Sequence, residues 1–163
     1  MKNRFNSIVT ELVIGTGLYA LVFIPLWAGT DYIPTVIDSN PSSPNAADIV
    51  QSFQINTSIV LGVSLLCFWI WFWLAGWEIH PTKPQGTWLL VWWLLLFVVV
   101  IAAIIAMVRS FLSLGENPDG FSGFTAASIY FGSGIFLYYL ASILSSPLRA
   151  RYRVPGAKLI HHS

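Results

Sequence analysis

Charged residues are scarce in this chain. Lysine, arginine, aspartate and glutamate together make up 9% of the 163 residues, whereas hydrophobic residues make up 56%. A typical soluble domain carries about 25% charged residues, so this chain has too few to cover a water-soluble globule. The formal net charge of +1 also provides no basic field for nucleic acid, and no nucleic-acid partner is expected.

Cysteine and histidine are scarce as well. The one cysteine, Cys67, lies in an apolar run, which excludes an internal disulfide and any dithiol chemistry that needs a pair. The three histidines, His80, His161 and His162, lie outside the apolar runs, which excludes bis-histidine haem ligation within a bilayer and disfavours histidine-ligated chlorophyll. No cofactor is therefore predicted, although a lipid, quinone or pigment held by backbone, water or aromatic stacking would leave no motif.

Two long apolar runs dominate the middle of the chain. Residues 57–77 and 87–108 contain no charge, and a short polar turn, residues 78–86, joins them. About 20 apolar residues are needed for a helix to cross a hydrocarbon core of about 30 Å, and a water-soluble helix would interrupt such a run every third or fourth position. Both runs are therefore predicted to be transmembrane helices joined by a tight hairpin.

Two further apolar runs complete the predicted fold. The first contains Glu11 and Pro25; it is longer than the core of a signal peptide, about 7–15 residues, and lacks the small residue three positions before a cleavage site, so we expect a retained helix. The predicted fold class is an all-α membrane protein, a single domain of four transmembrane helices. The spans lie at about 8–28, 57–79, 87–108 and 124–146.

The basic residues predict the orientation of these helices. Lysine and arginine occur near the N-terminus, in the hairpin turn and in the C-terminal tail, residues 147–163, whereas residues 29–56 carry three aspartates and no basic residue. By the positive-inside rule, both termini and the hairpin are cytoplasmic and residues 29–56 form an extracytoplasmic loop, in the plasma (inner) membrane. Within that loop, residues 46–54 have the pattern of a short amphipathic helix.

Tryptophans crowd the two helix ends beside the hairpin. Tryptophan prefers the membrane interface, where its ring is buried and its N–H stays wet, and basic residues there attract anionic lipid. These side chains are predicted to anchor the protein at the lipid interface. They are Trp69, Trp73, Trp77, Trp88 and Trp92, with Arg149, Arg151 and Arg153 of the tail.

The fourth run differs from the third in its small residues. Ser128 and Gly132 stand four positions apart, as do Ala141 and Ser145, and such spacing lets helix backbones approach closely within a membrane. These four residues are predicted to form a helix-packing face. The leucine- and valine-rich third run is predicted to contact lipid or to pack against another subunit.

Three ionisable residues are candidates for ion or proton binding. Glu11 lies inside a span, where ionisable groups are costly and often functional; in this one respect the chain resembles small four-helix multidrug transporters, which carry a glutamate in the first helix. The alternative is a carboxylate that reaches the interface or favours a helix N-terminus. Glu78 and His80 could relay protons or share a metal, but no neighbouring histidine or cysteine completes a ligand set, and a solvated turn is the alternative. No metal site is predicted.

Three functions are consistent with these features. The first is a non-catalytic integral-membrane subunit of a larger membrane protein complex, which provides packing, lipid contact and assembly. The second is a small oligomeric transporter or channel that uses Glu11, and the third is a membrane enzyme acting on lipid or quinone, for which no GxSxG, HExxH or P-loop motif is present. The first is favoured because the spans offer little for a polar pathway, so no catalytic activity of the chain's own is expected. The expected partners are membrane lipids and other integral-membrane subunits, or further copies of the chain.

Overall fold

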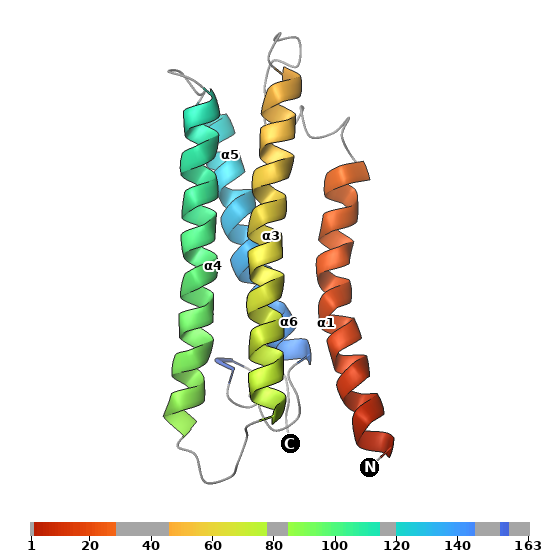
Figure 1. Ribbon diagram of the computed structural model, residues 1–163. Helices are drawn as coiled ribbons and strands as arrows, with labels where there is room; N and C mark the ends of the chain where they lie inside the picture. Colours follow the sequence, from red (N-terminus) through yellow and green to blue (C-terminus); the bar gives the residue numbers. More distant parts are fainter. Residues whose placement is uncertain (1, 29–45, 78–84, 115–119, 146–153, 157–163) are drawn as a thin grey trace.

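The computed structural model of the chain is a bundle of long helices (Figure 1). It describes residues 2–28, 46–77, 85–114, 120–145 and 154–156, and these contain no strand. The helices are α1 (Lys2–Ala28), α3 (Ala46–Trp77), α4 (Gln85–Leu114), α5 (Gly120–Phe131), a one-turn π-helix η1 (Gly132–Phe136) and α6 (Leu137–Ser145). Since α5, η1 and α6 follow one another without a break, they form one continuous helical rod, which is called the fourth rod below.

Four stretches of these helices are long and apolar enough to cross a membrane. They are Ile8–Ala28, Val50–Ala75, Thr87–Leu112 and Ala126–Ser145. The prediction of an all-α membrane protein with four transmembrane helices is therefore confirmed. The helices alternate in direction, so that α1 and α4 begin, and α3 and α6 end, at the same end of the bundle (Figure 1). That end is called the hairpin end below, and the opposite one the loop end.

The second span begins earlier than predicted. Residues 46–56, expected to belong to a loop with a separate short helix, are instead the first part of α3, which runs unbroken from Ala46 to Trp77. Residues 29–45 of the predicted loop lie outside the described residues. No proline or glycine lies between Ala46 and Thr57 to end a helix. Three polar side chains there, those of Gln54, Asn56 and Thr57, are buried in the bundle, and Thr57 donates to the carbonyl of Phe53 at 2.8 Å. Asn56, which begins a glycosylation sequon, is 3% exposed, so it is closed to modification in the folded bundle.

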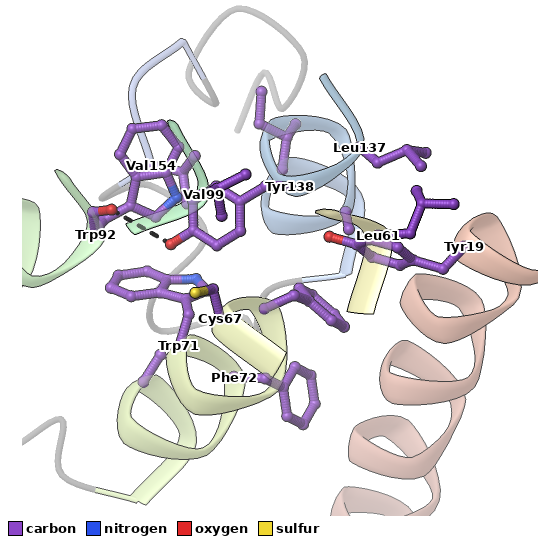
Figure 2. Packing of buried hydrophobic residues seen from close by; sticks show 14 of the residues in the cluster. Tyr19, Leu61, Cys67, Trp71, Phe72, Trp92, Val99, Leu137, Tyr138 and Val154 are labelled. Carbon is purple, nitrogen blue, oxygen red and sulfur yellow. Dashed lines mark hydrogen bonds between the residues drawn. The ribbon is translucent and has the colours of Figure 1, made fainter. Parts of the chain in front are cut away.

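The helix α3 lies at the centre of the bundle. It contacts α1, α4, α5, η1 and α6, whereas the main contacts of α1 among the described residues are with α3 and α6. The core at the hairpin end is aromatic: Trp71, Trp92 and Tyr138 converge between α3, α4 and α6 (Figure 2). A smaller cluster fills the loop end, where the ring of Phe53 stacks on that of Tyr130 with 5.5 Å between the ring centroids.

Two buried glycines mark the closest approaches between helices. A Cβ on Gly15 of α1 would lie 2.7 Å from Cε1 of Phe68 on α3 and 3.0 Å from Cβ of Ser145 on α6. A Cβ on Gly134 of η1 would lie 2.6 Å from Cγ1 of Val60 and 3.2 Å from Cγ1 of Val99. In lipid, small residues at such points allow the van der Waals contact that drives helix association. Gly15 therefore allows α1 to pack closely against α3 and α6. Gly134 allows the fourth rod to pack closely against α3 and α4.

Candidate functional site

Glu11 is the one predicted ionisable candidate that the structure places. It lies on α1 within the first span and is half-buried, toward the hairpin end. Glu78 and His80 lie outside the described residues, as do Arg149, Arg151 and Arg153 and the side chain of Trp77. Within the part of the chain that the structure describes, no three His, Cys, Asp or Glu side chains are grouped to hold a metal ion.

The predicted interfacial tryptophans separate into two kinds. Trp69 and Trp73 of α3 are exposed on the outer surface, as an anchor at the lipid interface would be. Trp88 and Trp92 of α4 are 4% and 1% exposed, so for these two the prediction of lipid contact is wrong. They face inward because α4 presents this side to α3 and the fourth rod. There the ring of Trp92 packs on that of Tyr138 with 5.4 Å between the ring centroids.

The predicted packing face separates in the same way. Ala141 and Ser145 of α6 are fully buried, and Ser145 lies against Gly15. Ser128 and Gly132 are exposed, and a Cβ on Gly132 would meet nothing within 4 Å. For contacts within this chain the prediction is therefore wrong at Ser128 and Gly132. The close approach occurs two residues later at Gly134, because residues two positions apart point to nearly opposite sides of a helix.

A chain of hydroxyl groups connects three helices through the middle of the bundle. The hydroxyl of Ser64 on α3 donates to the carbonyl of Gly134 at 2.8 Å, and it is 2.8 Å from the hydroxyl of Tyr19 on α1. Because Ser64 has one hydrogen, which goes to the carbonyl, Tyr19 must be the donor to Ser64. All three residues are buried, so Ser64 joins α1 to the fourth rod through α3.

Removing Ser64 is expected to cost more than removing the hydroxyl of Tyr19. Ser64→Ala leaves the buried Tyr19 hydroxyl without its acceptor, a loss of about 1–3 kcal/mol, whereas Tyr19→Phe removes one bond worth about 0.5–1.5 kcal/mol and leaves Ser64 bonded to Gly134. Unfolding by sodium dodecyl sulfate, followed by circular dichroism, measures both free energies. A Tyr19→Phe loss equal to or greater than the Ser64→Ala loss would contradict the donor order.

A second polar network lies near the loop end. The side-chain amide of Asn56 donates to Oγ of Ser110 at 2.9 Å, and this oxygen is 2.6 Å from the hydroxyl of Tyr130. The amide of Gln54 donates to the carbonyl of Leu26 at the end of α1 at 3.0 Å. These bonds pair buried polar groups that would be costly to leave unsatisfied away from water. They explain how α3 carries polar residues into its span.

A groove of about 280 Å³ runs between α1 and α3. It is lined by matching stripes of the two antiparallel helices, each at helical spacing. These are Thr16, Tyr19, Ala20 and Phe23 of α1, and Ser58, Leu61, Gly62 and Leu65 of α3. Ala20, Phe23 and Gly62 are exposed whereas Tyr19 and Leu61 are buried, so the groove has an aromatic and aliphatic floor and opens to the outer surface. None of the described residues that line it is charged.

Each end of the groove is closed by a hydrogen bond between the two helices. At the end nearer the loops, Nε1 of Trp27 donates to Oγ of Ser58 at 3.0 Å. At the other end, Nε1 of Trp69 donates to Oγ1 of Thr16 at 3.1 Å. The exposed indoles of α1 and α3 therefore hold the two helices together on either side of an open stretch.

Three buried polar atoms have no hydrogen-bond partner among the described residues. They are Nε1 of Trp88, Nε1 of Trp92 and Oγ of Ser145. All three belong to the hairpin end, and none of them lines the groove between α1 and α3.

Comparison with protein-family models, with curated proteins and with solved structures found no match. The function of this chain is therefore inferred from its own geometry.

Neither the groove nor the hydroxyl chain could be read from the sequence. Thr16, Ser58 and Ser64 are single polar residues in apolar runs, and nothing in their spacing pairs them with a particular helix. The only available signal was the repeat of small or polar residues on α1 at Thr16 and Ala20 and on α3 at Ser58 and Gly62, four positions apart in each.

Proposed function

We propose that this chain is a non-catalytic integral-membrane subunit of a larger membrane protein complex, to which it contributes packing, lipid contact and assembly. The observation that carries the proposal is the exposed pair Ser128 and Gly132 on the fourth rod. Small residues four apart let helices approach closely in a membrane, and no helix within the chain's described residues lies against Gly132. The pair is therefore suited to a helix of another polypeptide.

The surface of α4 supports the same assignment by contrast. Large apolar side chains follow one face of this helix from end to end, as expected of a surface that faces lipid. They are Leu90, Leu94, Phe97, Ile101, Ile105, Val108 and Leu112, all exposed. The bundle thus has a broad face suited to acyl chains and a narrow small-residue face suited to a helix.

The filled interior also favours a subunit over a transporter. Trp71, Trp92, Tyr130 and Tyr138 are fully buried in the centre of the bundle, and their packing occupies the space between the helices. Glu11 lies on α1 toward the hairpin end, on a helix with one of the most exposed surfaces of the bundle. Basic residues in the tail and in the hairpin turn favour a cytoplasmic location by the positive-inside rule. The proposal therefore places the hairpin end on the cytoplasmic side of the plasma (inner) membrane.

Gly132→Leu tests the assignment directly. The added side chain enters open space, so the fold is expected to be retained while association with other membrane chains is lost. Purification from native membranes in mild detergent, followed by native mass spectrometry, measures the composition. Gly62→Leu is the matched control, since it places the same side chain at another exposed glycine with nothing within 4 Å.

Two results would contradict the proposal. Recovery of copies of this chain alone would favour the small oligomeric transporter, whose test is loss of transport in Glu11→Gln. Retention of the same partners by Gly132→Leu would show that the exposed small-residue pair is not the contact. An absorption spectrum of the purified complex reports any bound pigment or quinone in the same preparation.

A further inference from the structure

The groove between α1 and α3 stays open although its residues would allow it to close. Ala20 and Gly62, one from each helix, both line it, and small residues of this kind normally let two helices meet. A Cβ on Gly62 would nevertheless meet nothing within 4 Å. The two indole hydrogen bonds, Trp27 to Ser58 and Trp69 to Thr16, join the helices on both sides of this space, so the opening has fixed ends.

The depth of the groove decides what part of a molecule it can hold. On α1 it extends from Thr16 to Phe23, about 10 Å at a rise of 1.5 Å per residue. The span ends at Ala28, so the groove lies about 7–18 Å below that end of the helix. Half of a hydrocarbon core of about 30 Å is about 15 Å. The groove therefore lies at the level of acyl chains and not of headgroups.

The lining restricts the chemistry of the occupant further. The described lining residues include no charged one, and the two hydroxyl groups at the ends of the groove, of Thr16 and Ser58, already accept hydrogen bonds from indoles. A polar ligand would find little to bind. A length of about 10 Å of transmembrane helix, with a diameter of about 10–12 Å including its side chains, has a volume of about 800–1,100 Å³, several times the volume of about 280 Å³ in the groove. A single uncharged linear chain fits both the lining and the size.

We infer that this groove is a binding site for one acyl chain of a membrane phospholipid, in the leaflet at the loop end. Tyr19 and Leu61 form the floor beneath the chain, Phe23 stands at the loop end, and Ala20 and Gly62 provide the room. The inference does not depend on the subunit role, because the groove lies on α1 and α3 whereas the proposed assembly face lies on the fourth rod. It assigns to the two indole hydrogen bonds the task of keeping the site open.

The test uses a phospholipid with a photoactivatable diazirine in the middle of one acyl chain. The purified protein is reconstituted into phosphatidylethanolamine–phosphatidylglycerol vesicles containing a trace of this probe, illuminated, and mapped by peptide mass spectrometry. In the wild type, labelling around Ala20 and Gly62 is expected to exceed that on the exposed face of α4 several-fold. Gly62→Leu and Ala20→Leu fill the groove, so labelling there should fall to the α4 level.

Gly17→Leu is the control for these variants. Gly17 also lies on α1 with nothing within 4 Å of a Cβ, but it does not line the groove, so labelling of the groove should persist. Circular dichroism and gel filtration verify that all variants keep the helical bundle. Labelling in the wild type no higher than on α4, or labelling that survives both filling variants, would overturn the site. Stronger competition by a long-chain isoprenoid quinone than by unlabelled phospholipid would overturn the choice of an acyl chain.

The outcome is distinguishable from that of the subunit proposal. Gly62→Leu is expected to lose the lipid and keep its partners, whereas Gly132→Leu is expected to lose its partners and keep the lipid. Loss of both properties in either variant would contradict the separation of the two surfaces.

Discussion

Replacing Trp92 with alanine is expected to destabilise the bundle by about 3 kcal/mol, the lower end of the range for truncating a buried aromatic residue to alanine. The lower end applies because lipid chains solvate apolar surface as well as a protein interior does, so the loss is one of packing and not of transfer from water. The ring of Trp92 is 1% exposed and packs on Tyr138 at 5.4 Å and on the edge of Tyr139 at 5.9 Å. Its removal leaves a cavity where α3, α4 and α6 meet (Figure 2).

The neighbouring Trp93 is the matched control. It is 51% exposed, and its main described contact is an edge-on approach to Trp92 at 5.1 Å, so Trp93→Ala is expected to cost less than about 1 kcal/mol. Unfolding by sodium dodecyl sulfate in mixed micelles, followed by circular dichroism, gives both values. Equal losses for the two variants would mean that Trp92 serves at the interface and not in the core.

Gly134→Leu is expected to have an effect of similar size through the opposite cause, overpacking. The first added carbon would lie 2.6 Å from Cγ1 of Val60 and 3.2 Å from Cγ1 of Val99. Both valines are fully buried, and their branched side chains have little rotamer freedom in a helix. We expect a loss of about 3 kcal/mol, at the upper end for overpacked cores, together with weaker docking of the fourth rod. The same unfolding measurement applies.

Gly132→Leu in the isolated chain separates this effect from the general cost of changing a glycine. It lies in the same π-helical turn, yet nothing is within 4 Å of its Cβ position, so its stability in detergent is expected to change by less than about 0.5 kcal/mol. A comparable loss in both variants would place the sensitivity in the π-helix itself and not in the contact with Val60 and Val99.

The four spans could be predicted because each is a long run without charge, and the cost of burying charge in a hydrocarbon core leaves few alternatives. The start of α3 could not, because Asn56 looks like a loop residue until its hydrogen-bond partner is known. Asn56 is paired with Ser110 on α4, 54 residues later. Residues so far apart in the sequence leave no local pattern that shows they are paired. From the sequence, a polar residue paired inside the bundle therefore cannot be distinguished from one exposed in a loop.

The inner and outer faces of the helices were harder still to predict. In a water-soluble helix, apolar residues mark the buried side, but in lipid both sides are apolar. Trp92 and Trp93 are adjacent and identical in type, yet one is buried and the other exposed. Likewise Gly132 and Gly134 differ only in which neighbours the rest of the fold brings to them. The candidate sites depend on these distinctions, so the sequence located the residues within the membrane but not their partners.

The π-helical turn lets the fourth rod hold about one residue more than a regular α-helix with the same packing faces would. Each residue of an α-helix advances the rotation by about 100°, and a π-helical turn accommodates an additional residue within one turn. Gly132–Phe136 therefore sets the rotational phase between α5, whose Tyr130 faces α4, and α6, whose Tyr138, Ala141 and Ser145 face the core. Because the π-helical turn already takes up about one residue of rotation, deleting one residue there would return the rod to a regular repeat while the buried side of α6 keeps nearly its present direction. Phe136 is 60% exposed and lies in this turn. Its place in the chain can therefore be lost more easily than that of a residue in α5 or α6, where a deletion would turn the rest of the rod by about 100°.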